Sequence, residues 1–228
     1  MKIFTVSDLH LPGTMDKTMD MFGAKWEGHF DKIKEDWQKK VTDEDIVLIA
    51  GDISWAMHLN QAKPDLEAIG ALPGKKILIR GNHDFWWASV SRVRDALPEN
   101  MFVLQNDAIK IGDYVFAGTR GWMDSNTEED KKIFAREQIR LELTLTAAQR
   151  LMDENSTLIM MLHSPPVINK VKFNQFVPKM EEFNVKYCVY GHLHGVNKSE
   201  AEIVEHNGIT YILSSCDMID FTLREVIT

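Results

Sequence analysis

Short apolar runs that end abruptly in polar residues recur along this chain, and they constrain its fold more than any other feature. Such runs are typical of strands buried on both faces of a sheet, each followed by a loop. Because loops from different strands converge at the ends of an α/β sheet, the residues after the runs are candidates for a shared site. The runs are KIFTV before Asp8 and His10, DIVLIA before Asp52, KKILI before Asn82, TLIMML before His163, and KYCVY before His192 and His194.

Helix-compatible segments lie between the early runs, at residues 17–40 and 61–71, and this alternation of strand and helix indicates an α/β fold. Two later runs, YVFAG from Tyr114 and ITYIL from Ile209, end without an obvious ligand and are expected in the sheet farther from the site. No repeat or linker marks a boundary, so residues 1–228 are expected to form a single domain.

The segment from 126 to 153 mixes apolar residues with many charges and is expected to be helical. Thr127 followed by acidic residues resembles a helix start. The segment fits either one long helix or two, and we expect a helical hairpin on the surface that packs its apolar side on the core.

The formal net charge of -8 argues against a broad basic surface, so tight non-specific binding to nucleic acid is not expected. The two cysteines, Cys188 and Cys216, are expected to be buried free thiols, which suits a reducing compartment. The N-terminus lacks the pattern of a signal peptide, and no run approaches the length of a membrane span. We therefore expect a cytoplasmic protein that does not bind membranes.

The candidate ligands suit a catalytic metal site. Asp8 and His10 are two residues apart, so a strand that continued through Leu9 would project both to one face, and the same holds for His192 and His194. Glycines precede three of the ligands and suit sharp bends or close approaches of the backbone. A mixture of imidazole, carboxylate and amide oxygen suits Mn, Fe, Zn or Co rather than a structural zinc finger.

The motifs D-x-H, G-D, G-N-H-D, a strand-end His and G-H-x-H, in this order, resemble the calcineurin-like metallophosphoesterase superfamily. The resemblance spans Asp8 to His194. It implies a sandwich of two β-sheets flanked by helices, with a two-metal site at the carboxyl ends of the strands. It also implies that Asp8, His10, Asp52 and His194 hold one metal ion, and that Asp52, Asn82, His163 and His192 hold the other, with Asp52 bridging. We favour Mn among the candidate ions.

Two cations about 3.5 to 4 Å apart acidify a water between them, which then attacks phosphorus in a phosphate monoester or diester. The resemblance assigns His83 as the acid that protonates the leaving oxygen, and Asp84 as the residue that orients and charge-stabilises His83. The chain is therefore expected to be a dinuclear metal-dependent phosphoesterase.

Several residues near the motifs allow two interpretations. Trp55, Trp86 and Trp87 either rim the pocket and stack a base or aryl group, or fill the core beneath the loops. Arg80 either contacts a phosphate oxygen or, as is more usual, pairs with a carboxylate. The remaining histidines have no motif partner; His29 and His206 are expected to be solvated or capping residues, and His58 stays open.

Two alternatives to a small-molecule phosphoesterase remain at this stage. One is a metal-binding scaffold without catalysis, which the complete ligand set and His83 argue against. The other is a nuclease, which the acidic balance and the lack of a basic run argue against. The expected substrate is a small phosphoester, with a nucleotide or aryl ester among the candidates. The oligomeric state does not follow from the sequence.

Overall fold

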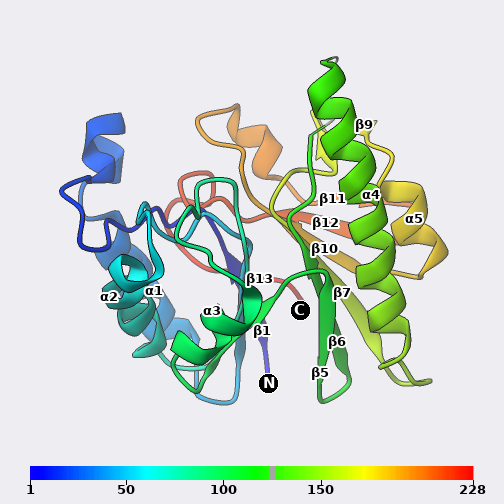
Figure 1. Cartoon of the computed structure of the whole chain (residues 1–228), viewed down its shortest axis with the longest axis horizontal. Coiled ribbons are helices and arrows are strands. Elements are labelled where there is room, and N and C mark those ends of the chain that lie inside the picture. The colour runs from blue at the N-terminus through cyan, green and yellow to red at the C-terminus, as the bar shows by residue number, and fades with distance from the viewer. Residues whose placement is uncertain (124–126, 228) are drawn as a thin grey trace.

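The computed structural model describes residues 1–123 and 127–227. Two β-sheets pack face to face, and helices cover the outer face of each sheet (Figure 1). Ile46, Leu48 and Ile77 of one sheet pack between the sheets against Ile159 and Val189 of the other. This arrangement confirms the predicted α/β sandwich flanked by helices.

The first sheet is built mainly from parallel strands of the N-terminal half. Its strands alternate between two apolar clusters: Ile46 and Leu48 face the second sheet, whereas Val47 and Ile49 face the helices. Helices α1 (His29–Lys40), α2 (Leu59–Gly70) and α3 (Val90–Ala96) cover the outer face. The strand order is β13 (Arg224–Glu225), β1 (Ile3–Val6), β2 (Ile46–Ile49), β3 (Lys75–Ile79) and β4 (Met101–Leu104), with β13 antiparallel to β1.

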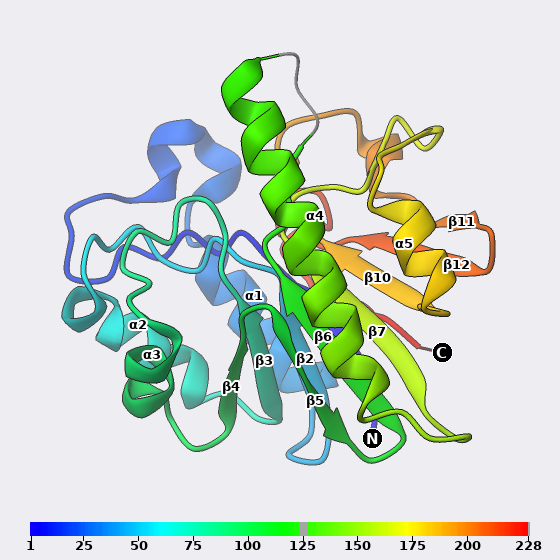
Figure 2. The same cartoon turned by 45° about the vertical axis from the view of Figure 1, so that its right-hand side comes forward.

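The second sheet has parallel central strands and an antiparallel strand at each edge. Helix α4 (Glu128–Gln149) runs along its outer face next to the short α5 (Val177–Glu182), as Figure 2 shows. The strand order is β11 (Val204–His206), β12 (Ile209–Leu213), β10 (Tyr187–Tyr190), β7 (Thr157–Leu162), β6 (Tyr114–Thr119) and β5 (Asp107–Ile111).

Shorter elements connect these layers. The 17–40 segment contains two 3-10 turns before α1 rather than one continuous helix. These two turns are η1 (Met19–Phe22) and η2 (Ala24–Trp26). A third 3-10 turn, η3 (Lys198–Ala201), lies between β10 and β11, and β8 (Val167–Ile168) pairs with β9 (Lys172–Phe173). No helix in the described part of the chain is long and apolar enough to cross a membrane.

The structure corrects two expectations about the fold. The predicted helical hairpin is the single 22-residue helix α4, capped by Thr127, which accepts a hydrogen bond from the Asp130 amide; residue 126 lies outside the described part. Phe134, Leu141, Leu145 and Ala148 fall on one stripe at helical spacing, so one helix buries them on the second sheet, whereas Ile139 and Leu143 lie on its exposed face. The strands at Tyr114 and Ile209 belong to the same sheet as the strands that precede His163 and His192.

The two sheets meet at the carboxyl ends of β1 and β12. The Ser7 amide donates to the Ser214 carbonyl at 2.7 Å, and the Cys216 amide donates to the Ser7 carbonyl at 3.0 Å. This junction brings the loop that follows β1 beside the loops of the second sheet, where the candidate ligands lie.

Candidate metal centre

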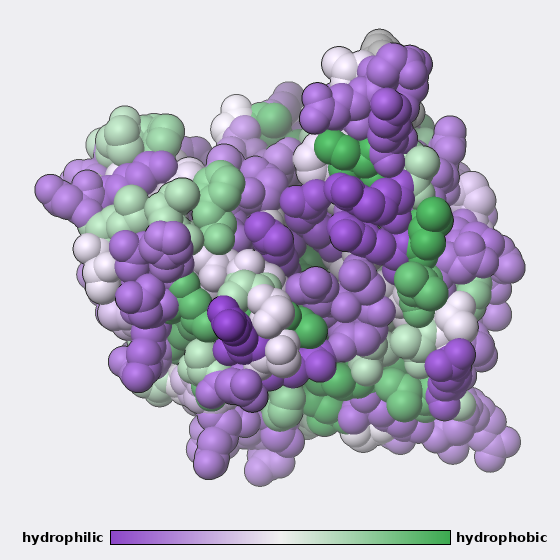
Figure 3. Space-filling model, viewed as in Figure 1, coloured by the Kyte–Doolittle hydropathy of each residue, from purple (hydrophilic) through white to green (hydrophobic). Residues whose placement is uncertain are grey.

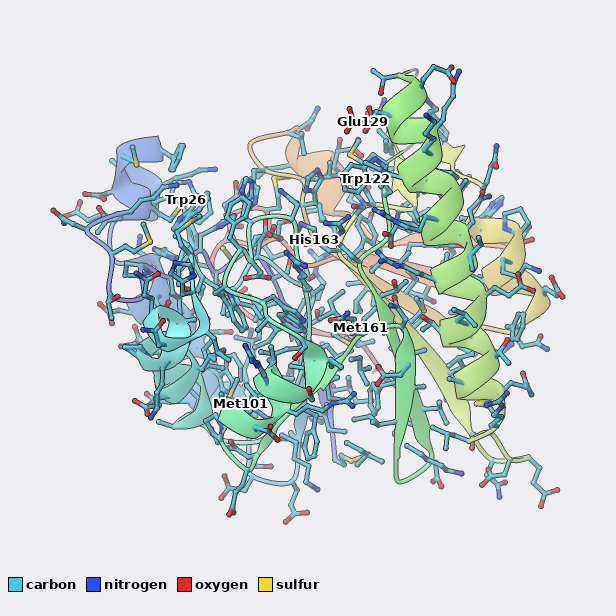
Figure 4. The ribbon with its side chains drawn as sticks, in the orientation of Figure 1. Trp26, Met101, Trp122, Glu129, Met161 and His163 are labelled. Atoms are coloured by element: carbon cyan, nitrogen blue, oxygen red, sulfur yellow. The ribbon has the colours of Figure 1, made fainter. Side chains whose placement is uncertain are left out.

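The candidate ligands form two groups of side chains. In the Asp8 group, which comprises Asp8, His10 and His194, the His194 Nε2 atom lies 3.1 Å from Asp8 Oδ1 and 3.4 Å from His10 Nε2. In the Asn82 group, which comprises Asn82, His163 and His192, the Asn82 Oδ1 atom lies 2.6 Å from His163 Nε2 and 2.8 Å from His192 Nδ1. Figure 4 shows His163 near the centre of the molecule, between Trp26 and α4.

Asp52 lies between the two groups. Its Oδ2 atom is 3.8 Å from His10 Nε2 in one group and 3.5 Å from His163 Nε2 in the other. The structure therefore brings all seven predicted ligands together, with Asp52 at the shared position.

This donor set fits divalent cations. Metal–ligand bonds of about 2.0–2.2 Å place neighbouring ligand atoms roughly 3 Å apart, close to the separations within both groups. The His194 Nδ1 atom faces a carboxylate oxygen of Asp217, so its Nε2 atom is directed toward His10 Nε2, and two imidazole nitrogens meet at 3.4 Å. A cation between them would satisfy both lone pairs.

The ligands converge for a different reason than strand alternation. The strands end at Val6 and Tyr190, and the backbone is left-handed at Asp8, His10 and His192, with φ values of 59°, 47° and 73°. Asp52 is also left-handed, with φ of 52°. The strand therefore does not continue through Leu9, and the condition for placing Asp8 and His10 by strand alternation is not met. Residues in the left-handed region of backbone geometry direct the ligands inward instead.

Close approaches explain two of the glycines in the motifs. A Cβ atom at Gly81 would lie 2.0 Å from the Asp52 Oδ1 atom, and one at Gly191 would lie 2.5 Å from the Asp8 Oδ2 atom. No larger residue fits at either position, so the glycines let carboxylate ligands approach the neighbouring backbone.

Asp84 organises the loops rather than orienting His83. Its buried carboxylate accepts hydrogen bonds from the amides of Asp52, Ile53 and Gly81 at 2.8–2.9 Å. It also accepts from the Ser54 amide and the Trp86 indole. These donors let Asp84 link the Asp52 and Asn82 loops, and in the described part of the chain its carboxylate acts on the His83 ring through charge and not through a hydrogen bond.

Supporting groups fix the histidine rings. His163 is fully buried, and its Nδ1 atom donates to the Ala50 carbonyl at 2.9 Å, which directs Nε2 toward Asn82. His194 Nδ1 donates to Asp217 at 2.7 Å, and Asp217 also accepts from Lys25 at 2.7 Å. Sequence reasoning missed Asp217, because it follows β12 without a motif.

The charges of the site perturb each other strongly. Burial would raise the pKa of Asp8, but the hydrogen bond and positive charge of His194 lower it well below its usual range. Burial raises the pKa of Asp52 to about 7 and lowers that of His10 to about 3 and that of His192 to about 4. Against burial, hydrogen bonds that the His194 ring donates to Asp217 and Asp8 raise the pKa of His194 to about 10. The carboxylates of Asp8 and Asp217 thus stabilise a positive charge on His194.

A cavity of about 360 Å³ opens beside the Asp8 group. His83 lines it, with its ring centroid 5.7 Å from that of His10 and 4.9 Å from that of Trp55. Burial and the charges of His163 and Lys17 lower the pKa of His83, whereas the charge of Asp84 acts in the opposite direction. The apolar part of the wall comes from Met19, Phe22, Trp26 and Trp55.

The tryptophans divide between the two interpretations. Trp86 and Trp87 are buried in the core of the first sheet, whereas the half-buried Trp55 lines the cavity and stacks on His10 at 4.5 Å. Lys17 Nζ lies 3.2 Å from the Trp55 ring centroid, and Phe22 is the exposed aromatic of the wall. Of the three tryptophans, Trp55 therefore lines the cavity, where Phe22 of η1 adds an exposed aromatic ring.

The orphan histidines are structural. His29 is buried and bonds the carbonyls of Leu9 and Trp26, which corrects the expectation of a solvated residue. His58 is exposed at the start of α2, where its amide donates to Gln61. His206 is half-exposed and stacks on Phe173. Cys188 and Cys216 are buried free thiols, as predicted.

Comparison with known families matches residues 1–196 to the model described as calcineurin-like phosphoesterase. The chain belongs to this family. The family and the clustered candidate ligands support, in general terms, a metal-dependent phosphoesterase.

Solved structures share the fold of this calcineurin-like phosphoesterase. The protein TT1561 of Thermus thermophilus superposes with a TM-score of 0.63 at 11% identity, over 98% of this chain and 96% of that one. The protein of unknown function AQ665 from Aquifex aeolicus gives 0.53 at 16% identity, over 98% and 95%. A comparison with curated proteins finds no match.

Proposed function

We propose that this chain hydrolyses a small phosphate monoester or diester with two metal ions, Mn being the first candidate. The Asp8 group and Asp52 hold one ion, and the Asn82 group and Asp52 hold the other. The observation that carries this proposal is the position of the Asp52 carboxylate, within 3.8 Å of a histidine of each group. When bound, the two ions supply Lewis-acid activation of water and of the phosphoryl oxygens.

The residues of the chain perform the remaining tasks. Asp84 fixes the Asp52 and Asn82 loops relative to each other, so the ligands are positioned before any substrate arrives. His83, on the cavity side of His10, is placed to protonate the leaving oxygen. A leaving group in the cavity lies beside His83 and is shielded from water by Trp26 and Met19.

The cavity supports an aryl or nucleoside leaving group. Its apolar wall suits a ring, and Phe22 is the aromatic side chain most available to contact one. A duplex would meet a protein of net charge -8, so we propose that small esters are preferred over DNA.

A substrate screen with Mn tests the proposal. Purified protein is assayed on 4-nitrophenyl phosphate, bis-(4-nitrophenyl) phosphate, a cyclic nucleotide, a phosphopeptide and linear duplex DNA at fixed ionic strength. We expect turnover of a small ester that is lost in Asp52→Asn. Efficient duplex cleavage with negligible ester turnover would make the protein a nuclease, and bound metal without any turnover would make it a scaffold.

A further inference from the structure

A second pocket, of about 220 Å³, lies between α4 and the carboxyl ends of β3 and β6. Figure 3 shows strongly hydrophilic residues gathered on this face beside the upper half of α4. The pocket is smaller than the roughly 300–1,000 Å³ that whole ligands occupy, so it suits one group of a larger molecule. Its charged lining consists of Arg80, Arg120, Arg136, Arg140 and Glu137.

The pocket carries an excess of positive charge. Four arginines meet one glutamate, which leaves three positive charges in a protein whose formal net charge is -8. The fully buried Glu137 pairs with Arg140 at 2.5 Å, whereas Arg120 and Arg136 are 3.9 and 4.0 Å away. Arg120 and Arg136 thus lie at the limit of ion-pair distance from Glu137, whose second carboxylate oxygen, Oε2, is buried without a hydrogen-bond partner. Arg80 lines the same pocket and forms no ion pair with Glu137 in the described part of the chain.

Arg80 shows that a partner is missing. Its Nε atom is buried without a hydrogen-bond partner, and no carboxylate in the described part of the chain lies within ion-pair distance of it. Buried N–H groups are nearly always satisfied, so an unpartnered guanidinium nitrogen in a basic pocket points to an anion. Burial lowers the pKa of Arg120, and the charges of Arg80, Arg140 and Arg136 add to this effect, while Glu137 opposes it.

The pocket adjoins the metal centre. Arg80 precedes Asn82 by two residues, which span at most about 7 Å between Cα atoms. The Arg120 carbonyl accepts the amide of His163 at 3.0 Å. The Cζ atom of the Arg120 guanidinium lies 4.7 Å from the centroid of the Trp122 ring. Figure 4 shows Trp122 beside α4. The pocket therefore lies beside the Asn82 group, whereas the apolar cavity lies beside the Asp8 group.

We propose that the arginine pocket binds a second phosphate group of the substrate, so that the preferred esters carry two phosphates within one small molecule. Arginine forks recognise phosphate through paired, charge-assisted hydrogen bonds, and four of them exceed what a neutral or singly charged group needs. Binding of phosphate by the pocket does not depend on the proposed function. The assignment of that phosphate to a substrate does.

Calorimetry with inorganic phosphate tests the pocket without catalysis. The full chain is treated with a chelator, so that metal ions do not contribute to phosphate binding. We expect Arg80→Gln and Arg136→Gln each to weaken binding about tenfold or more, the usual effect of losing a charged hydrogen bond. The matched control is Arg150→Gln. Arg150 is exposed and follows the end of α4, about 21 Å from Arg136 along the helix axis. Absence of binding by the wild type, or equal binding by all variants, would overturn the proposal.

Kinetics test the assignment to the substrate. Thymidine 5′-(4-nitrophenyl phosphate) is compared with the same ester carrying a 3′-phosphate, and the readout is the ratio of the two kcat/KM values. We expect a ratio of about ten or more that falls toward one in Arg136→Gln and stays unchanged in Arg150→Gln. A ratio near one in the wild type contradicts the proposal while the phosphoesterase stands. Phosphate binding that depends on the arginines, without turnover of either ester or of any ester in the substrate screen, would instead remove the proposed function and keep the pocket.

Discussion

The Asp8 group and the Asn82 group use similar ligands but are held in place differently. In the Asn82 group, the His163 ring is buried and rests on the carbonyl of Ala50. In the Asp8 group, the partly exposed His194 rests on the carboxylate of Asp217, which also pairs with Lys25. A carbonyl only orients a ring, whereas a carboxylate also adds negative charge and makes the ring a stronger ligand. The two metal sites should therefore respond differently to mutation.

Asp52→Asn should have the largest effect, because it removes the carboxylate that both groups share and that reduces the repulsion between two dications. We expect elemental analysis to find two ions per chain in the wild type and a loss at both sites in the variant, with turnover reduced by about 10⁴-fold or more. Asp31→Asn, at an exposed carboxylate, is the control. Loss of a single ion would show that Asp52 belongs to one group.

His83→Asn should lower turnover by roughly 10²- to 10⁴-fold and leave both ions bound, because it removes an acid on the Asp8 side and no ligand. The loss should be smaller for nitrophenyl esters, whose leaving groups need less protonation. His58→Asn, at the exposed start of α2, serves as the control. Metal loss equal to the activity loss would make His83 a ligand.

Asp217→Asn should weaken metal binding at the Asp8 group by about 10- to 100-fold and leave the other site nearly unchanged, since His194 is the one predicted ligand that Asp217 bonds in the described part of the chain. Chelator-treated protein is titrated with Mn in a calorimeter. The titration should show one weakened metal site and one unchanged site. Asp220→Asn removes an exposed carboxylate that pairs with Lys198 and is the matched control. Equal weakening of both sites would contradict the prediction that the Asp8 group and the Asn82 group respond differently to mutation.

The smallest effect is expected at the loop that follows Asp52, where the Ser54 hydroxyl donates to Asp65. Burial raises the pKa of Asp65 to about 6, although the hydrogen bonds from Ser54 and Gly13 act against it. A raised carboxyl pKa stabilises the fold at low pH, and this contribution is lost as pH rises from about 4 through 6.

The free energy of unfolding of the wild type, relative to Asp65→Asn, should therefore fall by roughly 1–2 kcal/mol over that interval, allowing for partial exposure. Urea denaturation at several pH values measures the difference, with the exposed Asp95→Asn as control. A difference that grows with pH would contradict the assigned direction of the shift.

The sequence singled out seven residues that the structure brings together, because each follows a buried parallel strand and the carboxyl ends of such strands meet; that they bind metal ions stays a prediction. Strand alternation does not account for their convergence, since left-handed geometry at Asp8 and His10 depends on contacts made only in the folded chain. Asp84 illustrates the same limit: its motif was visible, but three of its amide donors come from residues 30 to 32 positions away along the chain.

The sequence contains a weak indication of the arginine pocket, which was not among the predictions. Arg136 and Arg140 are four residues apart and share one face of α4. Between them, Glu137 occupies a position in the apolar stripe that includes Phe134 and Leu141. A charged residue in such a stripe indicates a buried partner, yet Arg80 and Arg120 come from distant strands, and only the fold places them there.

The left-handed residues of the metal centre also bear on how the protein could be made more heat-resistant. Each left-handed residue lowers the free energy of unfolding by about 1–2 kcal/mol. The four ligands together therefore lower it by an amount comparable to the roughly 5–15 kcal/mol by which domains are stable. Glycine at Asp8, His10, Asp52 or His192 would relieve this cost and would also remove the ligand. Screens for thermostability alone would therefore favour variants that have lost the metal site, so each round of such engineering should also select for bound metal.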